Sequence, residues 1–321
     1  MKCGNMTKEE QDSLQTWLEH YTNQFRDRDG VLHPLLELKR CHSLRVAGNA
    51  RFIAAALSFP ESEQRLAEGV GLVHDVGRFT QFVRYGSFRD SDTVDHGAEG
   101  RRVLEEQDPS FLPDSGDRER LFCVVEYHNR KRTDIPRRLS PEKNRFLSLI
   151  RDADKLDIME LVLRAVVNDG FQDLREMLPH IRLSRELSPG VLAEAAKKGS
   201  VSNGNLSTLA DFLVMMATWC YDMNYPPTRH LAVKRGILPR IRRELPDTKP
   251  VRELFAGIED AMMRTVEISE KKSYQAKGEI ECFTDGPIYE DMRQWVDQKK
   301  PRIAAAVLRV DELYSGAEKL I

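Results

Sequence analysis

His74 and Asp75 form an adjacent pair whose side chains are suited to binding a metal ion. A neutral imidazole nitrogen and a carboxylate oxygen are common ligands of divalent cations, and one short stretch of backbone supplies both here. If residues 61–75 form a helix, the two side chains leave its last turn about 100° apart, so both can reach one ion, or one can bridge two. Such pairs also occur by chance, so the interpretation depends on which other residues could join this one.

Four more candidate ligands lie on other predicted helices, mostly near the apolar face of each. They are His42, His96, His128 and Asp154. A polar side chain on an apolar helix face is either buried at a cost or has a function. One ion could be held by His42, His74, Asp75 and Asp154, and a second by Asp75, His96 and His128. This mixture of imidazole and carboxylate suits manganese, iron, magnesium or zinc better than copper.

The run from Asp152 to Asp157 contains three carboxylates that could supply the last ligand. Counted at 100° per residue from the apolar Ile150, Asp154 lies about 40° away and Asp157 about 20°, whereas Asp152 is turned about 160° away. Asp154 is therefore the first choice as the inward carboxylate, with Asp157 as the alternative. Asp152 is expected to cap a helix, to pair with a basic residue or to face solvent.

Basic residues near the candidate ligands could neutralise a phosphate. Arg78 follows Asp75 by three residues, in a segment from 78 to 90 where three arginines alternate with aromatic residues. These arginines could clamp phosphate oxygens, or the aromatic side chains could anchor a loop while the arginines face water. Lys155 could neutralise charge beside Asp154, or it could be an exposed helix lysine. The predicted catalytic residues are Asp75, Arg78 and Lys155, with Arg45 as an additional candidate.

Helices are predicted to position all of these residues. Apolar side chains recur at three- and four-residue steps, and Gly77 is expected to let the chain turn after the His74-Asp75 pair. Predicted helices cover residues 12–26, 36–57, 61–75, 96–107, 115–129, a stretch from 140 onward, 166–185, 189–198, 206–221 and the tail to 321. The prediction is an all-α fold. It has an N-terminal helix in residues 1–29, a metal-binding core in 30–165, and a C-terminal helical extension of the same globule in 166–321.

Composition restricts the function further. The 321 residues include 49 basic and 51 acidic ones, a formal charge of −2, which argues against a protein that coats nucleic acid. No apolar run approaches the roughly 18 residues needed to cross a bilayer, and the first residues lack the apolar core of a signal peptide. Five scattered cysteines without a Cys-x-x-Cys spacing indicate reduced thiols. We expect a soluble cytoplasmic protein with no stable nucleic-acid partner and no membrane association.

The order of these motifs resembles the HD-domain superfamily of metal-dependent phosphohydrolases. The likeness covers residues 30–165, with His42 in a His-Ser-Leu-Arg-Val-Ala run, then His74-Asp75, His96 and His128, and finally Asp154 in Ala-Asp-Lys-Leu. It implies a helical bundle that holds one or two divalent ions. His42, His74, Asp75 and Asp154 would be the shared ligands, and His96 and His128 would be ligands in members with two ions. The implied reaction is hydrolysis of a nucleotide or another small anionic phosphoester by an activated water.

The start His42-x-x-Arg45 is also similar to the HD-GYP branch, which hydrolyses cyclic di-GMP. The chain has Glu126-Tyr127-His128 where that branch has His-His-Glu, and it lacks Gly-Tyr-Pro, so cyclic dinucleotide hydrolysis is not expected. The segment 78–90 is instead similar to uncharacterised bacterial HD phosphohydrolases, which leaves the substrate open. Two alternatives to a phosphohydrolase remain: a di-iron oxygenase that uses the same six ligands, as some HD-type proteins do, and a non-catalytic signalling or scaffold protein.

Overall fold

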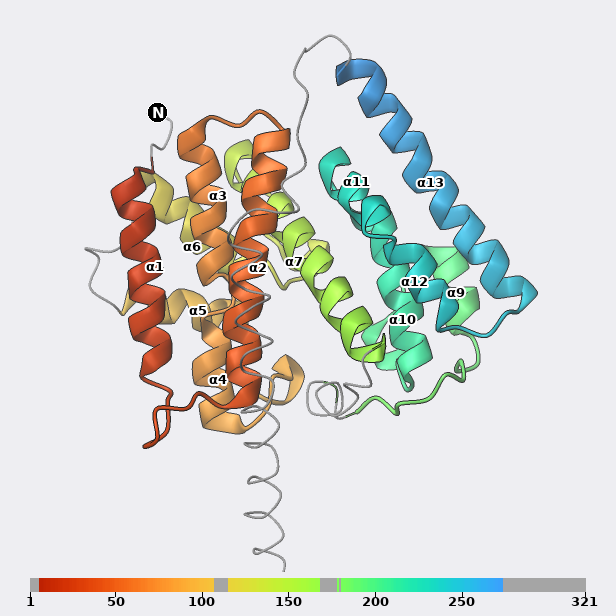
Figure 1. The fold of residues 1–321 in the computed structure, drawn as a ribbon, viewed down its shortest axis with the longest axis horizontal. Coiled ribbons are helices and arrows are strands. Elements are labelled where there is room, and N and C mark those ends of the chain that lie inside the picture. Colours follow the sequence, from red (N-terminus) through yellow and green to blue (C-terminus); the bar gives the residue numbers. More distant parts are fainter. Residues whose placement is uncertain (1–5, 107–114, 168–177, 179, 274–321) are drawn as a thin grey trace, which may run out of the picture. The chain divides into compact units, whose positions relative to one another are not determined.

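Helices account for the fold of this computed structural model, which describes residues 6–106, 115–167, 178 and 180–273 (Figure 1). The first group of helices is α1 (Lys8–Asn23), α2 (Pro34–Ala56), α3 (Glu61–Val73), α4 (Gly77–Tyr85), α5 (His96–Glu105), α6 (Ser115–Tyr127) and α7 (Pro141–Val167). The second group is α9 (Val191–Lys198), α10 (Leu209–Thr218), α11 (Pro226–Lys234), α12 (Ile237–Arg243) and α13 (Lys249–Ser273). The described residues form no strand, and their β pairing consists of two isolated bridges. The all-α prediction is confirmed.

Short polar side chains fix where several helices begin. The Thr7 hydroxyl accepts a hydrogen bond from the Glu10 N–H while the Glu10 carboxylate accepts one from the Thr7 N–H, a capping box at the start of α1. The Ser140 hydroxyl accepts a hydrogen bond from the Lys143 N–H ahead of α7. The Asp95 carboxylate accepts from the Ala98 N–H, so α5 begins at His96. The local sequence thus places His96 at the first position of α5.

The helices α2, α3 and α7 pack on one another around a fully buried apolar core. Its members include Val46, Ile53, Leu66, Val70, Phe146 and Leu149. Burying each such side chain stabilises the fold by about 1.5–3 kcal/mol. In Figure 1, α7 lies between the two groups of helices, and it packs on α2, α3 and α6 as well as on α11 and α12. It is therefore a main contact between the two groups, alongside the contact of α11 with α2.

Gly77 is required for a close approach of two helices and not for a turn. Its backbone is not among the described positions with positive φ, and it is the first residue of α4. A Cβ at this position would lie 2.2 Å from the His96 carbonyl oxygen and 2.5 Å from the Gly100 nitrogen. The prediction that Gly77 serves the turn is wrong, because the turn at residues 74–76 is made before it. Its missing side chain brings the segment after Asp75 against the start of α5.

The change Gly77→Ala is expected to destabilise the fold by about 3 kcal/mol or more, because the added methyl group would overlap backbone atoms that cannot rotate away. The matched control is Gly48→Ala in α2, where an exposed Cβ meets nothing within 4 Å. That change should stabilise the protein by about 1 kcal/mol because alanine is the better helix former. Urea denaturation of both variants measures the difference, and equal stabilities would contradict the packing described here.

Two stretches differ from the sequence prediction. Residues 78–85 continue as a helix after Gly77, whereas the sequence suggested an irregular loop. Residues 181–185, the end of the helix predicted over 166–185, are not helical, and Arg182 instead pairs with Thr208 in an isolated bridge. The predictions for 168–177, for 179 and for the tail from 274 fall outside the described residues.

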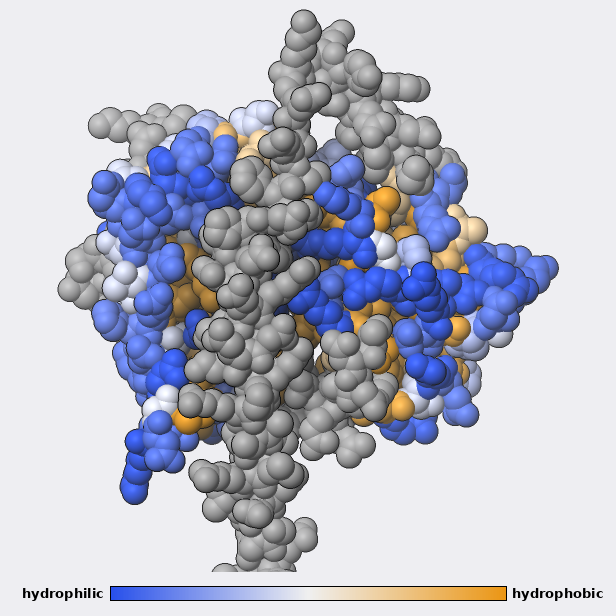
Figure 2. Space-filling view, in the orientation of Figure 1, coloured by the Kyte–Doolittle hydropathy of each residue, from blue (hydrophilic) through white to orange (hydrophobic). Residues whose placement is uncertain are grey.

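The chain divides into two units at residue 270, and the features below belong to the first, Met1–Glu270. The boundaries proposed from the sequence at residues 29 and 165 stay predictions. None of the described helices combines the length and the apolar character needed to cross a bilayer. On the face shown in Figure 2 the described surface is mostly hydrophilic, with apolar atoms visible in small areas.

Candidate metal centre

The structure brings the six predicted ligands together from five segments of the chain. His42 projects from α2 and Asp154 from α7, whereas the other four lie at helix ends: His74 and Asp75 follow α3, His96 begins α5 and His128 follows α6. In the described part of the chain, two groups of side chains could hold an ion, and the ligand atoms of each lie within 4.8 Å of one another. The first group is His42, His74 and Asp75, and the second is Asp75, His96 and His128.

Asp75 stands between the two groups, with one carboxylate oxygen toward each. Its Oδ2 lies 3.6 Å from His42 Nε2 and 3.8 Å from His74 Nε2. Its Oδ1 lies 3.3 Å from His96 Nε2 and 3.5 Å from His128 Nε2. A single carboxylate so placed can bridge two cations, which is the arrangement expected from the sequence.

Asp154 joins the first group. Its Oδ1 lies 3.1 Å from His42 Nε2 and 3.8 Å from His74 Nε2. Asp157, the alternative carboxylate, approaches the other nitrogen of His42 at 2.7 Å and is held by Arg45 at 2.6 Å. The two carboxylates thus flank the same imidazole, and Asp154 is the one on the side of the Nε2 atoms. Its side chain is 20 % exposed and those of the four histidines at most 5 %, so the cluster opens to solvent on this side.

All four imidazoles are oriented in the same way, with Nδ1 away from the cluster and Nε2 toward it. His74 Nδ1 lies 2.8 Å from the Gly71 carbonyl, and His128 Nδ1 lies 2.8 Å from the Val125 carbonyl. His42 Nδ1 lies 2.7 Å from the Asp157 carboxylate, and His96 Nδ1 lies 2.6 Å from the Asp90 carboxylate. Carbonyl and carboxylate oxygens only accept hydrogen bonds, so each Nδ1 carries the proton. With that proton on Nδ1, Nε2 is the ring nitrogen that each imidazole directs into the cluster, where its lone pair can bind a metal.

These nitrogens are not satisfied by the protein. Within the part of the chain that is described, His42 Nε2 and His74 Nε2 are buried without a hydrogen-bond partner. His96 Nε2 and His128 Nε2 lie 3.1 Å apart, so two lone pairs would face each other unless a proton or a cation lies between them. Buried polar atoms of native proteins are rarely left unpaired, and one cation in each group would satisfy all four nitrogens. The residues present therefore fit a divalent metal.

The charge states of the side chains suit the same use. Burial lowers the pKa of both His74 and His96 to about 4, so both rings are neutral at pH 7. Burial acts to raise the pKa of Asp75, but Lys39 and the neighbouring imidazoles hold it well below its ordinary value. For His42 burial acts to lower the pKa, but Asp154 and Asp157 outweigh it, and the pKa is raised. A metal competes with protons for such ligands, so its affinity is expected to fall as the pH decreases.

The turn that carries His74 and Asp75 is held from two sides. The Tyr21 hydroxyl in α1 donates a hydrogen bond to the Val76 carbonyl at 3.1 Å. On the other side α3 lies against α2, where a Cβ at Gly71 would be 2.7 Å from Ala47 Cα. These contacts fix the pair relative to His42, which lies on α2.

Two cations stand beside Asp75. Lys39 Nζ lies 2.7 Å from Asp75 Oδ2, and Arg78 Nε lies 3.7 Å from Asp75 Oδ1. Arg78 also donates to the Phe88 carbonyl and to Asp90, so it is fixed near the cluster and does not face water. The other two arginines of this segment, Arg84 and Arg89, are about half exposed. Phe79 is fully buried in the core, as expected if the aromatic side chains anchor the segment, and the phosphate-clamping role of the arginines stays a prediction.

Lys155 and Asp152 point away from the cluster. Lys155 Nζ forms an ion pair with Asp222, so the sequence prediction that it neutralises a phosphate stays a prediction. Asp152 is fully buried and accepts hydrogen bonds from the Asn224 and Tyr225 N–H groups. Among the expectations for Asp152, exposure to solvent is wrong, because α11 packs on this side of α7.

Three polar residues around the cluster were missed by sequence reasoning. Lys39 lies three residues before His42, so the helical period that selected Arg45 could have identified it. Asp90 binds His96 and receives a hydrogen bond from the Asn129 amide at 3.1 Å. No local pattern in the sequence pairs residues 90, 96 and 129.

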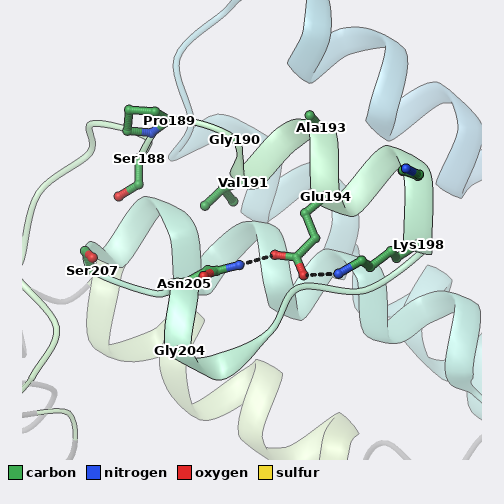
Figure 3. A pocket seen from close by; sticks show the side chains of 11 residues that line it. Ser188, Pro189, Gly190, Val191, Ala193, Glu194, Lys198, Gly204, Asn205 and Ser207 are labelled. Carbon is green, nitrogen blue, oxygen red and sulfur yellow. Dashed lines mark hydrogen bonds and ion pairs between the residues drawn. The ribbon is translucent and has the colours of Figure 1, made fainter.

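The described chain also has a surface depression of about 590 Å³ that shares no residue with this cluster. It lies between α9 and the loop from Gly204 to Ser207 (Figure 3). The Glu194 carboxylate in its lining is already paired, since it accepts from Asn205 and Lys198. The depression therefore offers no comparable chemistry.

Comparison with known families gives a result consistent with this geometry. The family model of the HD domain matches residues 40–159, the stretch that contains all six converging side chains. Comparisons with curated proteins and with solved structures gave no significant match.

Proposed function

Residues 40–159 are an HD domain, and from that premise we propose that the protein is a metal-dependent phosphohydrolase acting on a nucleotide or another small phosphoester. HD domains are generally found in metal-dependent phosphohydrolases. The family match supports this reaction class, and the cluster of side chains in this chain supports the particular reaction.

One observation carries the proposal: four Nε2 lone pairs converge on the two oxygens of one carboxylate, Asp75. A structural ion pair does not need four buried imidazoles, and in the described part of the chain the Nε2 atoms of His42 and His74 are buried without hydrogen-bond partners, which costs free energy. The arrangement is therefore best explained as a ligand set. His42, His74, Asp75 and Asp154 would hold one divalent ion, and Asp75, His96 and His128 a second.

When bound, the ions would supply Lewis acidity that polarises a phosphoryl oxygen and brings the pKa of water toward neutrality. The protein's own residues provide orientation and charge. Asp157 and Asp90 fix the rings of His42 and His96, and such partners also increase the basicity of the ligand nitrogen. Manganese, iron, magnesium and zinc all suit a set of four imidazoles and two carboxylates.

Lys39 and Arg78 are the residues best placed to receive negative charge. Both lie beside Asp75 and both are mostly buried, so they are little screened by water. In the proposed reaction they stabilise the charge that develops on the phosphoryl oxygens. The partly exposed side of the cluster, at Asp154, is the direction from which a small anionic substrate would enter.

The test is a metal-reconstitution experiment. Protein stripped with a chelator should release no phosphate from a panel of nucleotides, phosphomonoesters and phosphodiesters. When Mn²⁺, Fe²⁺, Mg²⁺ and Zn²⁺ are added one at a time, at least one of them should restore activity. The restored activity should be lower at acidic pH, because protons compete with the metal for the ligands. Phosphate release and bound metal are measured on the same samples.

Two results would count against the proposal. Undiminished activity after complete removal of metal would exclude the ions from the reaction. Consumption of oxygen by the iron-loaded protein, with no phosphate released from any ester, would favour a di-iron oxygenase on the same ligands.

A further inference from the structure

We infer that residues 219–228, which join α10 to the first turn of α11, are a positioning element of the metal centre. This segment is called the 219–228 connection below. It lies outside the residues matched by the HD domain, yet it binds the stretch of α7 that carries Asp154. The inference rests on the proposed function only in taking Asp154 as a metal ligand.

Asp152 is the main contact between α7 and the connection. It is fully buried, and its carboxylate accepts hydrogen bonds from the Asn224 and Tyr225 N–H groups at 3.0 Å each. It also accepts from the Asn224 amide at 2.8 Å and from the Thr228 hydroxyl at 2.7 Å. Four donors around one buried carboxylate fix the rotamer of Asp152 and hold this turn of α7 against the connection.

Lys155, one residue after Asp154, provides a second attachment. Its ammonium group pairs with Asp222, which also lies 3.3 Å from an Arg132 guanidinium nitrogen. Asp154 is thus flanked along the chain by two residues, Asp152 and Lys155, that both bind the 219–228 connection. Because these bonds lie on either side of the ligand, they restrain rotation of α7 about its axis.

Arg235, the residue that follows α11, links the second group of helices to α2. Arg235 donates to the Asn49 amide oxygen at 2.8 Å, and the Asn49 nitrogen donates to the Ala153 carbonyl at 3.3 Å. Asn49 lies on α2, two turns after His42. The second group of helices therefore contacts both α2 and α7, and the 3.1 Å approach of Asp154 to His42 depends on the relative placement of those two helices.

The decisive comparison is between Asp152→Asn and Asp211→Asn. Asp211 is also fully buried, and it also accepts from backbone N–H groups and a hydroxyl, those of Ser188, Ser207 and Thr208 near the start of α10. It forms no hydrogen bond with α7. Both variants should lower the unfolding temperature. Only Asp152→Asn should weaken binding of Mn²⁺, by about tenfold, measured by calorimetry on the full chain.

A milder pair keeps the test valid if Asp152→Asn does not fold. Thr228→Val removes one hydrogen bond to Asp152, whereas Thr218→Val removes an equally buried hydroxyl that donates to the Met215 carbonyl in its own helix. We expect a loss of Mn²⁺ affinity of about threefold for the first and none for the second. If the two variants within each pair changed the Mn²⁺ affinity equally, the 219–228 connection would contribute only ordinary packing. That result would overturn the inference.

A measurement without metal separates this inference from the proposed function. The ¹⁵N chemical shift of His42 Nε2 depends on how close the Asp154 carboxylate lies to this nitrogen. The signal is assigned by its absence from the spectrum of the His42→Gln variant. Asp152→Asn should shift it and Asp211→Asn should not. An unshifted signal in Asp152→Asn would refute the positioning role whatever the protein hydrolyses. Failure of the phosphoester panel alone would refute only the proposed function.

Discussion

Asp75→Asn is expected to lower phosphohydrolase activity about a thousandfold and to remove most of the bound metal. The carboxylate is the only ligand shared by both groups, so its loss affects both proposed ions. An amide keeps the size of the side chain but carries no charge, so Lys39 also loses the carboxylate with which it forms an ion pair. Lost Lewis acid catalysis is worth several kcal/mol, and each 1.4 kcal/mol is about tenfold in rate.

The matched control is Asp12→Asn, which removes an exposed carboxylate whose partner is Lys8. Activity and metal content should both be unchanged by it. Phosphate release under saturating metal and metal content after desalting give the two readouts. Activity of Asp75→Asn within tenfold of the unmodified protein would show that the central carboxylate does not take part.

His128→Gln is expected to remove one ion and to keep the other. His128 contacts Asp75 and His96 but belongs only to the second group, so the ligands at His42 and His74 remain intact. Bound metal should therefore fall from two equivalents to one, and activity by about thirtyfold if the second ion contributes half of the free energy of the Lewis acid effect. Metal content measured by mass spectrometry, with a parallel activity assay, distinguishes a one-ion from a two-ion centre.

His230→Gln serves as the control for this change, because His230 is an exposed residue of α11 outside both groups. Its metal content should equal that of the unmodified protein. If His128→Gln retained two equivalents of metal, the second group would not be a metal site.

The candidate ligands could be identified from the sequence because each depends on a local pattern. Apolar residues at helical spacing indicate which face of a helix is buried, and the candidate ligands lie on or near those faces. The angular comparison along α7 placed Asp154 and Asp157 on the inner side, and the structure has both beside His42. Which of the two faces the Nε2 atoms depends on the position of α2, and no spacing within α7 specifies it.

The remaining features depend on contacts between distant segments. Gly77 looks like a turn residue in the sequence, and only the packing of α4 on α5 shows that its missing side chain is what matters. Asp152 was correctly turned away from the cluster, but its burial follows from α11, more than seventy residues later in the chain. The pairing of Lys155 with Asp222 likewise depends on where the second group of helices lies.

The central claim is that the converging imidazoles and Asp75 bind divalent ions. Crystals grown with Mn²⁺ and measured at the manganese absorption edge test it directly, because anomalous scattering locates the ions independently of the protein atoms. The account predicts one peak in contact with His42, His74, Asp75 and Asp154 and a second with Asp75, His96 and His128. Well-ordered side chains at these six positions with no anomalous peak among them would contradict it.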